Sequence, residues 1–185
     1  MPNFTIEGRL KGLPDPQRDF LWEVTILNFD LGDSSPEDLT LRAKNISIPG
    51  RSNEPIETYF YGHKQKFSGR SAFSNQISIQ FEETEDQKIL RTFYHWFQKI
   101  NNTDPLQPFA TLSTTLTKRQ YAKRMFLTMY KYNGEEVRNK IEFVNVFPES
   151  IADVALDMTS NAAVKYDVQF SYDYWTLQGP DRINI

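Results

Sequence analysis

The strongest constraint on this chain is a long alternation of apolar and polar residues near its end. Between Ala163 and Trp175, valine, tyrosine or phenylalanine stands at every second position, with lysine, aspartate, glutamine and serine between them. A period of two places alternate side chains on opposite faces of a β-strand. We therefore predict one long strand here, with an apolar aromatic face and a polar, partly acidic face.

Length and composition favour one β-rich domain. The chain has 185 residues, enough for one sizeable core, and no Pro-, Gly- or Ser-rich linker divides it. Fourteen phenylalanines and nine tyrosines suit pleated sheet surfaces. We predict a single domain over residues 1–185, with an irregular N-terminal arm at 1–19 and a long contact loop at 101–117.

Charge and cysteine content exclude several classes of function. The formal net charge is -3 and charges of both signs are interspersed, so no basic stripe favours tight nucleic-acid binding. The sequence has no apolar run long enough to span a bilayer and no signal-like start, which predicts a soluble protein made in the cytoplasm without membrane insertion. Zero cysteines exclude disulfides, thiolate nucleophiles and sulfur-ligated metals.

The first half of the chain carries several strand patterns. We predict strands at 20–27 and at 39–48, the second ended by Pro49 and Gly50. A hairpin-like pair is predicted from 57–67 and 73–81, joined around residues 68–70.

One helix and a second hairpin follow. Residues 84–87 form a capping box that opens a helix ending near Ile100, with its apolar stripe facing a sheet. Asn133-Gly134 between alternating runs predicts a type I′-like hairpin turn. We expect a helical turn at 148–151, a short strand at 154–158, and then the final strand. The sum is a mainly β fold, a β-sandwich or barrel with one flanking α-helix.

No constellation of side chains predicts catalysis, a cofactor or a metal. His63 and His95 belong to different predicted elements, and zinc ligand spacing is absent. The acidic residues at 82–86 lack the ligand order of a calcium loop and are better explained as helix capping. No nucleophile, base and orienting partner can be grouped, so we predict that the protein is not an enzyme.

Several segments, in order, resemble the inner tail tube proteins of contractile-tailed bacteriophages, over most of residues 20–175. The most specific are Ile48-Pro49-Gly50, Phe93 to Trp96, Arg119 to Ala122, and the closing run from Phe147-Pro148 through Ser160-Asn161 to Tyr174-Trp175. Each is weak alone, but their order and spacing together are specific.

The resemblance implies a structural virion protein without cofactors. Family subunits form hexameric rings that stack into a hollow tube for genome delivery inside a contractile sheath. Expected partners are further copies of the chain, the sheath protein, the baseplate hub and tube initiator, the tape measure protein and the tail terminator. DNA would pass without specific binding, and assembly would occur in the host cytoplasm. Asp167 and Asp173 are candidate lumen-facing residues that would repel phosphates.

Other functions remain open at this point. A tube initiator of the baseplate, or the tube of an injection system, would keep the fold but change its place. A different class is a small-ligand-binding β-sandwich that uses exposed aromatics such as Tyr59, Tyr61 and Tyr130. A basic patch at 118–124, interleaved with Tyr121, could contact nucleic acid weakly but better suits ion pairs between subunits.

Overall fold

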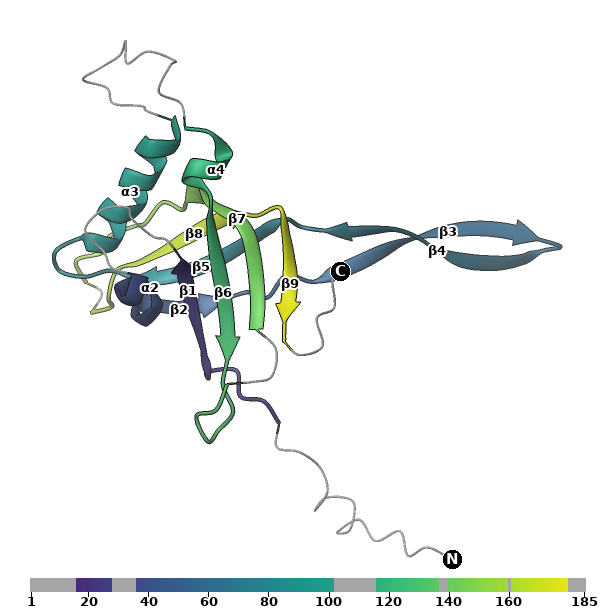
Figure 1. Cartoon of the computed structure of the whole chain (residues 1–185), viewed down its shortest axis with the longest axis horizontal. Helices are drawn as coiled ribbons and strands as arrows, with labels where there is room; N and C mark the ends of the chain where they lie inside the picture. Colours follow the sequence, from purple (N-terminus) through teal and green to yellow (C-terminus); the bar gives the residue numbers. More distant parts are fainter. Residues whose placement is uncertain (1–15, 28–35, 102–115, 137–139, 160, 180–185) are drawn as a thin grey trace, which may run out of the picture.

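A computed structural model describes residues 16–27, 36–101, 116–136, 140–159 and 161–179. These residues form a two-layered β body with helix α3 beside it and a long hairpin projecting from one end (Figure 1). The mainly β sandwich with one flanking helix is therefore confirmed. The elements are β1 (Trp22–Leu27), α2 (Pro36–Arg42), β2 (Ala43–Ile46), β3 (Arg51–Phe60), β4 (His63–Phe73), β5 (Gln76–Glu82), α3 (Lys88–Asn101), α4 (Lys118–Tyr121), β6 (Lys123–Met129), β7 (Lys140–Ile151), β8 (Lys165–Ser171) and β9 (Tyr174–Gln178).

The two layers share strand β7. The strand order is β1-β6-β7-β8-β5-β2, with β9 also paired to β7 and every pairing antiparallel. The first part of β7 pairs with β6 and β9, and its last residues pair with β8. A register shift opposite Lys123–Met125 leaves an extra residue in β7 at Val144 and Asn145, just before this change, and Asn145 has a φ of 59°. Such a shift bends a strand, so β7 passes from one layer to the other.

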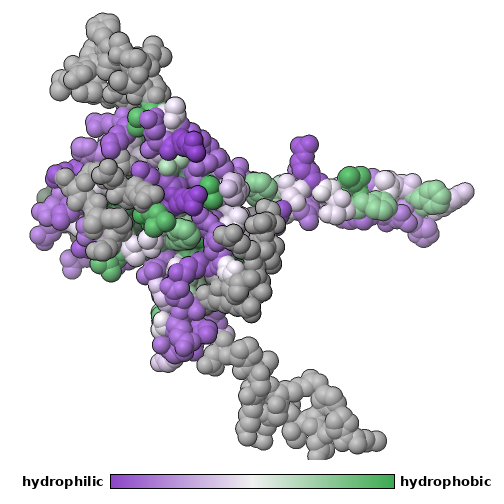
Figure 2. All heavy atoms as spheres, viewed as in Figure 1, coloured by the Kyte–Doolittle hydropathy of each residue, from purple (hydrophilic) through white to green (hydrophobic). Residues whose placement is uncertain are grey.

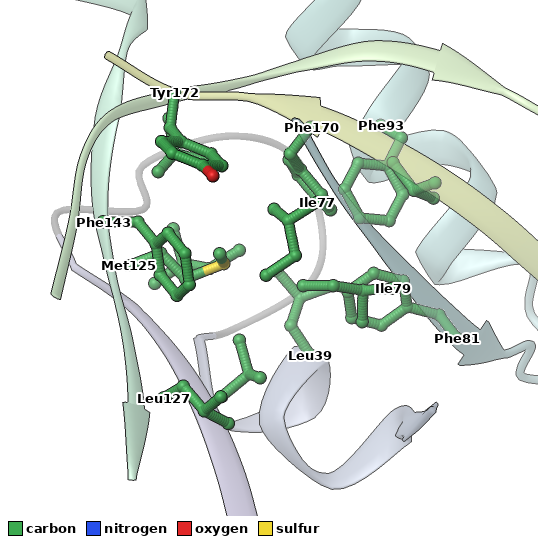
Figure 3. Packing of buried hydrophobic residues seen from close by; sticks show 14 of the residues in the cluster. Leu39, Ile77, Ile79, Phe81, Phe93, Met125, Leu127, Phe143, Phe170 and Tyr172 are labelled. Carbon is green, nitrogen blue, oxygen red and sulfur yellow. The ribbon is translucent and has the colours of Figure 1, made fainter. Parts of the chain in front are cut away.

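Aromatic rings from both layers and from α3 make the core (Figure 3). The Phe170 ring on β8 lies 6.3 Å from that of Phe81, 5.8 Å from that of Phe93 and 6.2 Å from that of Trp96. Phe143 and Tyr172 add a second edge-to-face pair at 5.2 Å. These contacts join the helix to the sheet, as the apolar stripe of α3 predicts.

The region predicted as one strand at 39–48 is partly helical. Residues 36–42 form α2, and only Ala43–Ile46 form a strand. Leu39 is buried and Leu41 is exposed. Residues two apart share one face of a strand but lie on roughly opposite sides of a helix, so this burial pattern is helical. The Thr40 hydroxyl donates to the Val24 carbonyl at 2.6 Å and holds the helix against β1. Pro36 at the first helical position was the missed signal.

The first hairpin turns at a different place from the predicted one. The turn lies at Tyr61 and Gly62, with φ of 48° and 78°, and not at residues 68–70. Positive φ at both central residues is the two-residue hairpin geometry that matches strand twist. Gly69 instead lies within β4, where an added Cβ would stand 2.3 Å from the Glu54 carbonyl oxygen. This glycine therefore serves a close approach beside the register shift between Asn53 and Pro55.

The hairpin at Asn133-Gly134 is confirmed in place, but its turn type is different. Gly134 has φ of 82°, whereas Asn133 does not have a positive φ. The Gly134 amide donates to the Lys131 carbonyl at 3.0 Å, and the Lys131 amide donates to the Glu135 carbonyl at 2.8 Å. This pattern is a type I turn followed by a glycine in the left-handed region, the usual three-residue hairpin loop.

Three predictions for the C-terminal part were wrong. Residues 148–151 continue β7 instead of forming a helical turn, and residues 154–158 form no strand. The long final strand is divided into β8 and β9 at Tyr172 and Asp173, because the chain crosses there from one layer to the other. Of the predicted arm, residues 16–19 are irregular and exposed, while 1–15 lie outside the described residues, as do 102–115 of the predicted contact loop.

Candidate assembly surfaces

The β3–β4 hairpin projects from the body without a partner among the described residues. It forms a separate two-stranded sheet, and every residue of β3 is exposed (Figure 1). Ten residues of extended strand span about 33 Å. Two-stranded hairpins are marginally stable in water by themselves. A hairpin of this length therefore needs a further surface to pack against.

The two faces of the hairpin differ in chemistry. Ile56 pairs with Phe67, and Phe60 follows on the same side of the hairpin. Their exposed fractions are 57%, 53% and 65%. We call Ile56, Phe60 and Phe67 the apolar hairpin face, and apolar residues gather visibly on the hairpin in Figure 2. Because exposed apolar side chains this close together are unusual on a monomer, the face has the character of an interface.

The opposite side of the hairpin is charged. The Glu57 carboxylate lies 2.6 Å from the Lys64 ammonium and 3.5 Å from that of Lys66. Tyr59 pairs with Lys64 on this side and is largely exposed. These cross-strand pairs set the register of the hairpin and leave its apolar side free for contact.

A second surface is the outer side of the layer formed by β2, β5, β8 and the end of β7. Hydroxyl and amide side chains dominate it and bond across the strands. The Gln80 amide donates to Asp167 at 3.0 Å, and the Gln76 amide donates to Glu149 at 2.9 Å. The Ser150 hydroxyl donates to Gln169 at 3.3 Å. We call this surface the polar sheet face.

The two predicted lumen residues do not lie together. Asp167 is exposed on the polar sheet face. Asp173 is half-buried after the crossing to the other layer, where it pairs with the Lys118 ammonium and accepts from the Asn145 amide at 2.6 Å. The hydrogen bonds from Lys118 and then Asn145 lower the pKa of the Asp173 carboxyl. Its charge is thus balanced within the subunit, while that of Asp167 faces solvent.

A cavity lies between the two end strands of the sheet. Strands β1 and β2 end the strand order, so each has one unpaired edge. The cavity has a volume of about 480 Å³ and is lined mainly by Trp22, Ile46, Ile48, Leu127 and Met129. We call it the seam cavity.

The acidic residues before α3 cap the helix, as predicted, but mainly through a residue outside the predicted box. The Glu83 carboxylate accepts from the backbone amides of Ile89 and Leu90 at 3.0 and 2.9 Å. The Thr84 hydroxyl accepts from the Lys88 amide at 3.1 Å, whereas the Gln87 amide bonds to the Thr84 carbonyl. A carboxylate at this end also favours the helix dipole.

The other singled-out side chains are dispersed. His63 lies on β4 and His95 on α3, and no group of three or more potential metal ligands occurs within the described part of the chain. Tyr59 and Tyr61 lie on the hairpin, far from Tyr130 at the end of β6, so they do not form one aromatic site.

The basic patch at 118–124 is largely paired within the subunit. Lys118 bonds to Asp173, and Arg124 lies 3.5 Å from the buried Glu142. Its basic groups thus stabilise the subunit itself.

In the described part of the chain, no helix combines the length and apolarity that crossing a membrane requires.

Sequence reasoning missed the apolar hairpin face. The signal was present, since Ile56, Thr58 and Phe60 alternate with Glu57 and Tyr59, but the predicted turn lay around Gly69 and not at Gly62.

One family model matches most of the chain, and several solved structures share its fold. The family model for phage tail tube protein matches residues 18–178, whereas no curated protein matches the chain by sequence. Among solved structures, the tube-terminating cap of the anti-feeding prophage is 19% identical with a TM-score of 0.60, covering 90% of this chain and 93% of that one. A chain of the sheath-tube complex of the PVC extracellular contractile injection system is 18% identical with a TM-score of 0.57, and the match covers 95% of this chain and 98% of that one.

A chain of the anti-feeding prophage baseplate gives 10% identity, a TM-score of 0.61, and coverage of 91% and 99%. At these identities the structural likenesses establish a shared fold. The family itself follows from the match over residues 18–178. The chain belongs to the phage tail tube protein family and is a structural protein of a tail tube.

Proposed function

We propose that this chain is the repeating subunit of the inner tube of a contractile tail. Hexameric rings of the chain stack into a hollow conduit for genome delivery, surrounded by a contractile sheath. The observation that carries the proposal is the unpartnered β3–β4 hairpin on a subunit that matches the tube family. A monomer gains nothing from about 33 Å of exposed two-stranded sheet, whereas an assembly can cover it.

The polar sheet face is our candidate for the lumen wall. Its serine and glutamine side chains bond to one another and to carboxylates across the strands. Lys165, at the start of β8, is a basic residue on this face, and it pairs in register with Glu82. The wall therefore offers passing DNA little net positive charge, and Asp167 adds repulsion. Asp173 stays in the proposal as a residue at the edge of this wall, with its charge balanced by Lys118.

The proposed partners follow the same architecture. Further copies of the chain form the rings and the stack, and the sheath protein surrounds them. The baseplate hub and tube initiator, the tape measure protein and the tail terminator complete the tail, which is assembled in the host cytoplasm. Support comes from the fold neighbours, which belong to a sheath-tube complex, a terminating cap and a baseplate. The role is non-enzymatic.

A second candidate function has the same fold, but its tube does not deliver a phage genome. The chain could form the tube of an injection system, or the tube segment at its cap or baseplate. The observation that favours it is that the fold neighbours named above come from contractile injection systems. Negative-stain images of a purified virion would separate the two, because only a tail tube is attached to a DNA-filled head.

The test of the proposed function is electron microscopy of the purified chain, paired with its mass in solution across a concentration series. We expect rings or hollow tubes with an open centre and a mass that rises with concentration. A chain that remains monomeric at the highest concentration, in the presence of sheath and baseplate extract as well, would contradict the proposal. The variant Lys131→Glu changes the charge of an exposed turn away from the β3–β4 hairpin, and it should assemble as the unmodified chain does.

A further inference from the structure

The seam cavity leaves core-facing side chains of the sheet only partly covered. Trp22 stands two residues before the buried Val24 on β1, so both side chains lie on the core face, yet Trp22 is only half-buried. Met129 on β6 is half-buried in the same way. Ile48, which also lines the cavity, is 53% exposed. Neighbouring apolar side chains of this size are normally covered, either within a subunit or in an interface.

Helix α2 covers the adjoining part of the same sheet edge. The Leu21 carbonyl accepts from the Tyr130 amide on the β6 side at 2.8 Å. The alternate residues Trp22 and Val24 therefore direct their backbone groups to the outer edge of β1. The Thr40 hydroxyl of α2 donates to the Val24 carbonyl at 2.6 Å. The fold thus covers this edge at Val24, and the seam cavity lies at the next outward-directed residue, Trp22.

The edge of β2 presents backbone groups to the cavity from the other layer. The Ser47 amide donates to the Ser78 carbonyl of β5 at 3.4 Å. Ile46 and Ile48, on either side of Ser47, therefore direct their amides and carbonyls away from β5. The side chains of both isoleucines line the cavity. An extended segment at this edge can bond to the backbone of β2 and place alternate side chains in the cavity.

The chain itself brings a suitable segment to this place. The polar lining residues of the cavity are Gln17, Arg18 and Asp19, so the residues that precede them in the sequence start at the cavity. Within residues 4–10, Phe4 and Ile6 are two positions apart. At this spacing, side chains share one face of an extended segment. The segment therefore offers two large apolar side chains to a cavity lined by apolar ones.

Residues 11–16 are long enough to connect this segment to the cavity. Six extended residues span up to about 20 Å. Gly12, Pro14 and Pro16 among them favour a reversal of the chain. A segment tethered in this way has an effective concentration on the order of millimolar, which favours the chain's own segment over that of a second copy.

We propose that residues 4–10 of the same chain occupy the seam cavity as an added strand beside β2, with Phe4 and Ile6 as anchors. The inference is independent of the proposed function, because it concerns the subunit's own sheet and not a contact between copies. Burial of the anchors against Trp22 and Met129 supplies the affinity. The added strand also protects the edge of β2 from pairing with unrelated strands.

Cross-linking tests this placement in the full chain, which has no native cysteine. Thr5 stands between the two anchors, and the exposed Ser47 stands between the two cavity-lining isoleucines. In the variant Thr5→Cys with Ser47→Cys, we expect a short bis-maleimide to link the two thiols within one chain, as identified by peptide mass mapping. The control Thr5→Cys with Ala155→Cys has its second thiol in an exposed loop that lines a different cavity, and it should not link.

Removal of the anchors tests the energetic contribution. Phe4→Ser with Ile6→Ser should lower the midpoint of thermal unfolding by about 2–4 °C. The matched control, Thr5→Ser with Glu7→Ser, changes the alternate positions and should shift the midpoint by less than about 1 °C. Ile48→Ser should lower the midpoint less in the anchor variant than in the unmodified chain, because the contact it removes is already lost there.

The outcomes decide between the chain's own segment and other occupants. A link from Thr5→Cys to Ser47→Cys within one chain, together with a lowered midpoint in the anchor variant alone, supports the placement. The two single-cysteine variants are also mixed, and a linked dimer in the mixture would assign the cavity to a second copy and overturn the proposal. Absence of the link, an equal link to Ala155→Cys, or an unchanged midpoint in the anchor variant would overturn it as well. None of these outcomes depends on rings or tubes, so a failure of this inference is distinct from a failure of the proposed function.

Discussion

Strands β5 and β3 have similar sequences in one respect and opposite surroundings. In β5, Ile77, Ile79 and Phe81 alternate with polar residues and are buried. In β3, Ile56 and Phe60 belong to a similar alternation, yet all ten residues of the strand are exposed. Alternation therefore predicts an apolar strand face that must be buried against another surface. Alternation does not show whether that second surface belongs to the same chain or to another chain.

The energetic consequence is large for such a small element. Full burial of a Phe or Ile side chain is worth about 1.5–3 kcal/mol relative to exposure. In β5 this contribution stabilises the subunit, and in β3 it becomes available only on association. The hairpin should therefore matter to the assembly and hardly to the folded monomer.

The largest expected effect on the free subunit comes from its core. We expect Phe170→Ala to lower the free energy of unfolding by about 3–5 kcal/mol, because the side chain packs against Phe81, Phe93 and Trp96. Urea unfolding at low protein concentration measures it. Phe67→Ala removes the same side chain from the hairpin and is the matched control, with an expected change within about 0.5 kcal/mol. An equal loss of unfolding free energy in Phe170→Ala and Phe67→Ala would show that the hairpin side chain stabilises the free subunit as much as the core side chain does.

The cap of α3 should give the next largest effect. Glu83→Ala removes the acceptor for the Ile89 and Leu90 amides, and we expect a loss of about 1–2 kcal/mol in the free energy of unfolding. Glu83→Gln keeps an acceptor oxygen and should lose less. If Glu83→Ala were as stable as the unmodified subunit, the helix start would not depend on this carboxylate.

Asp173 should give a smaller, pH-dependent effect. Its pKa is lowered from 3.8, first by the hydrogen bond from Lys118. A carboxyl with a lowered folded-state pKa stabilises the subunit above its unfolded-state pKa, and that stability is lost as the pH falls through the folded-state value. Since both partners are partly exposed, Lys118→Ala should cost at most about 1 kcal/mol near neutral pH.

The measurement is urea unfolding of both proteins at about pH 7 and about pH 3. The difference between Lys118→Ala and the unmodified subunit should shrink at the lower pH. A difference that stays constant would mean that Lys118 acts through its packing near Phe147 and not through the carboxylate.

The hairpin should show the smallest effect on the subunit and a complete effect on assembly. We expect Ile56→Ser with Phe67→Ser to change the free energy of unfolding of the monomer by less than about 0.5 kcal/mol. Sedimentation of the same protein should show no stacked tubes. Assembly at normal levels would show that the apolar hairpin face is not an interface.

Much of the fold was predictable because its signals are local. The stripe of α3, the Asn133-Gly134 hairpin and the alternating strands β1, β5 and β8 follow from periodicity and turn chemistry. The division between β8 and β9 could not be predicted, since the sequence alternates without interruption through Tyr172. The crossing is set by strand pairing in two layers, a long-range feature.

The candidate surfaces were predictable only in part. The polar face that carries Asp167 follows from the alternation, whereas the pairing of Asp173 with Lys118 joins residues far apart in the sequence. The exposed hairpin was hidden because Tyr61-Gly62 is a weaker turn signal than Asn-Gly. Residues 1–15 and 102–115 lie outside the described structure, so the predicted arm and contact loop stay predictions.

On the proposed function, the β3–β4 hairpin is stabilised by contacts in the assembly and not within the free subunit. Hydrogen exchange of the backbone amides at 51–73, compared between dilute subunit and assembled tubes, tests it most directly. We predict fast exchange in the subunit and strong protection in the tube, while the amides of β5 and β8 are protected in both states. Equal exchange of the hairpin amides in the two states would contradict the account.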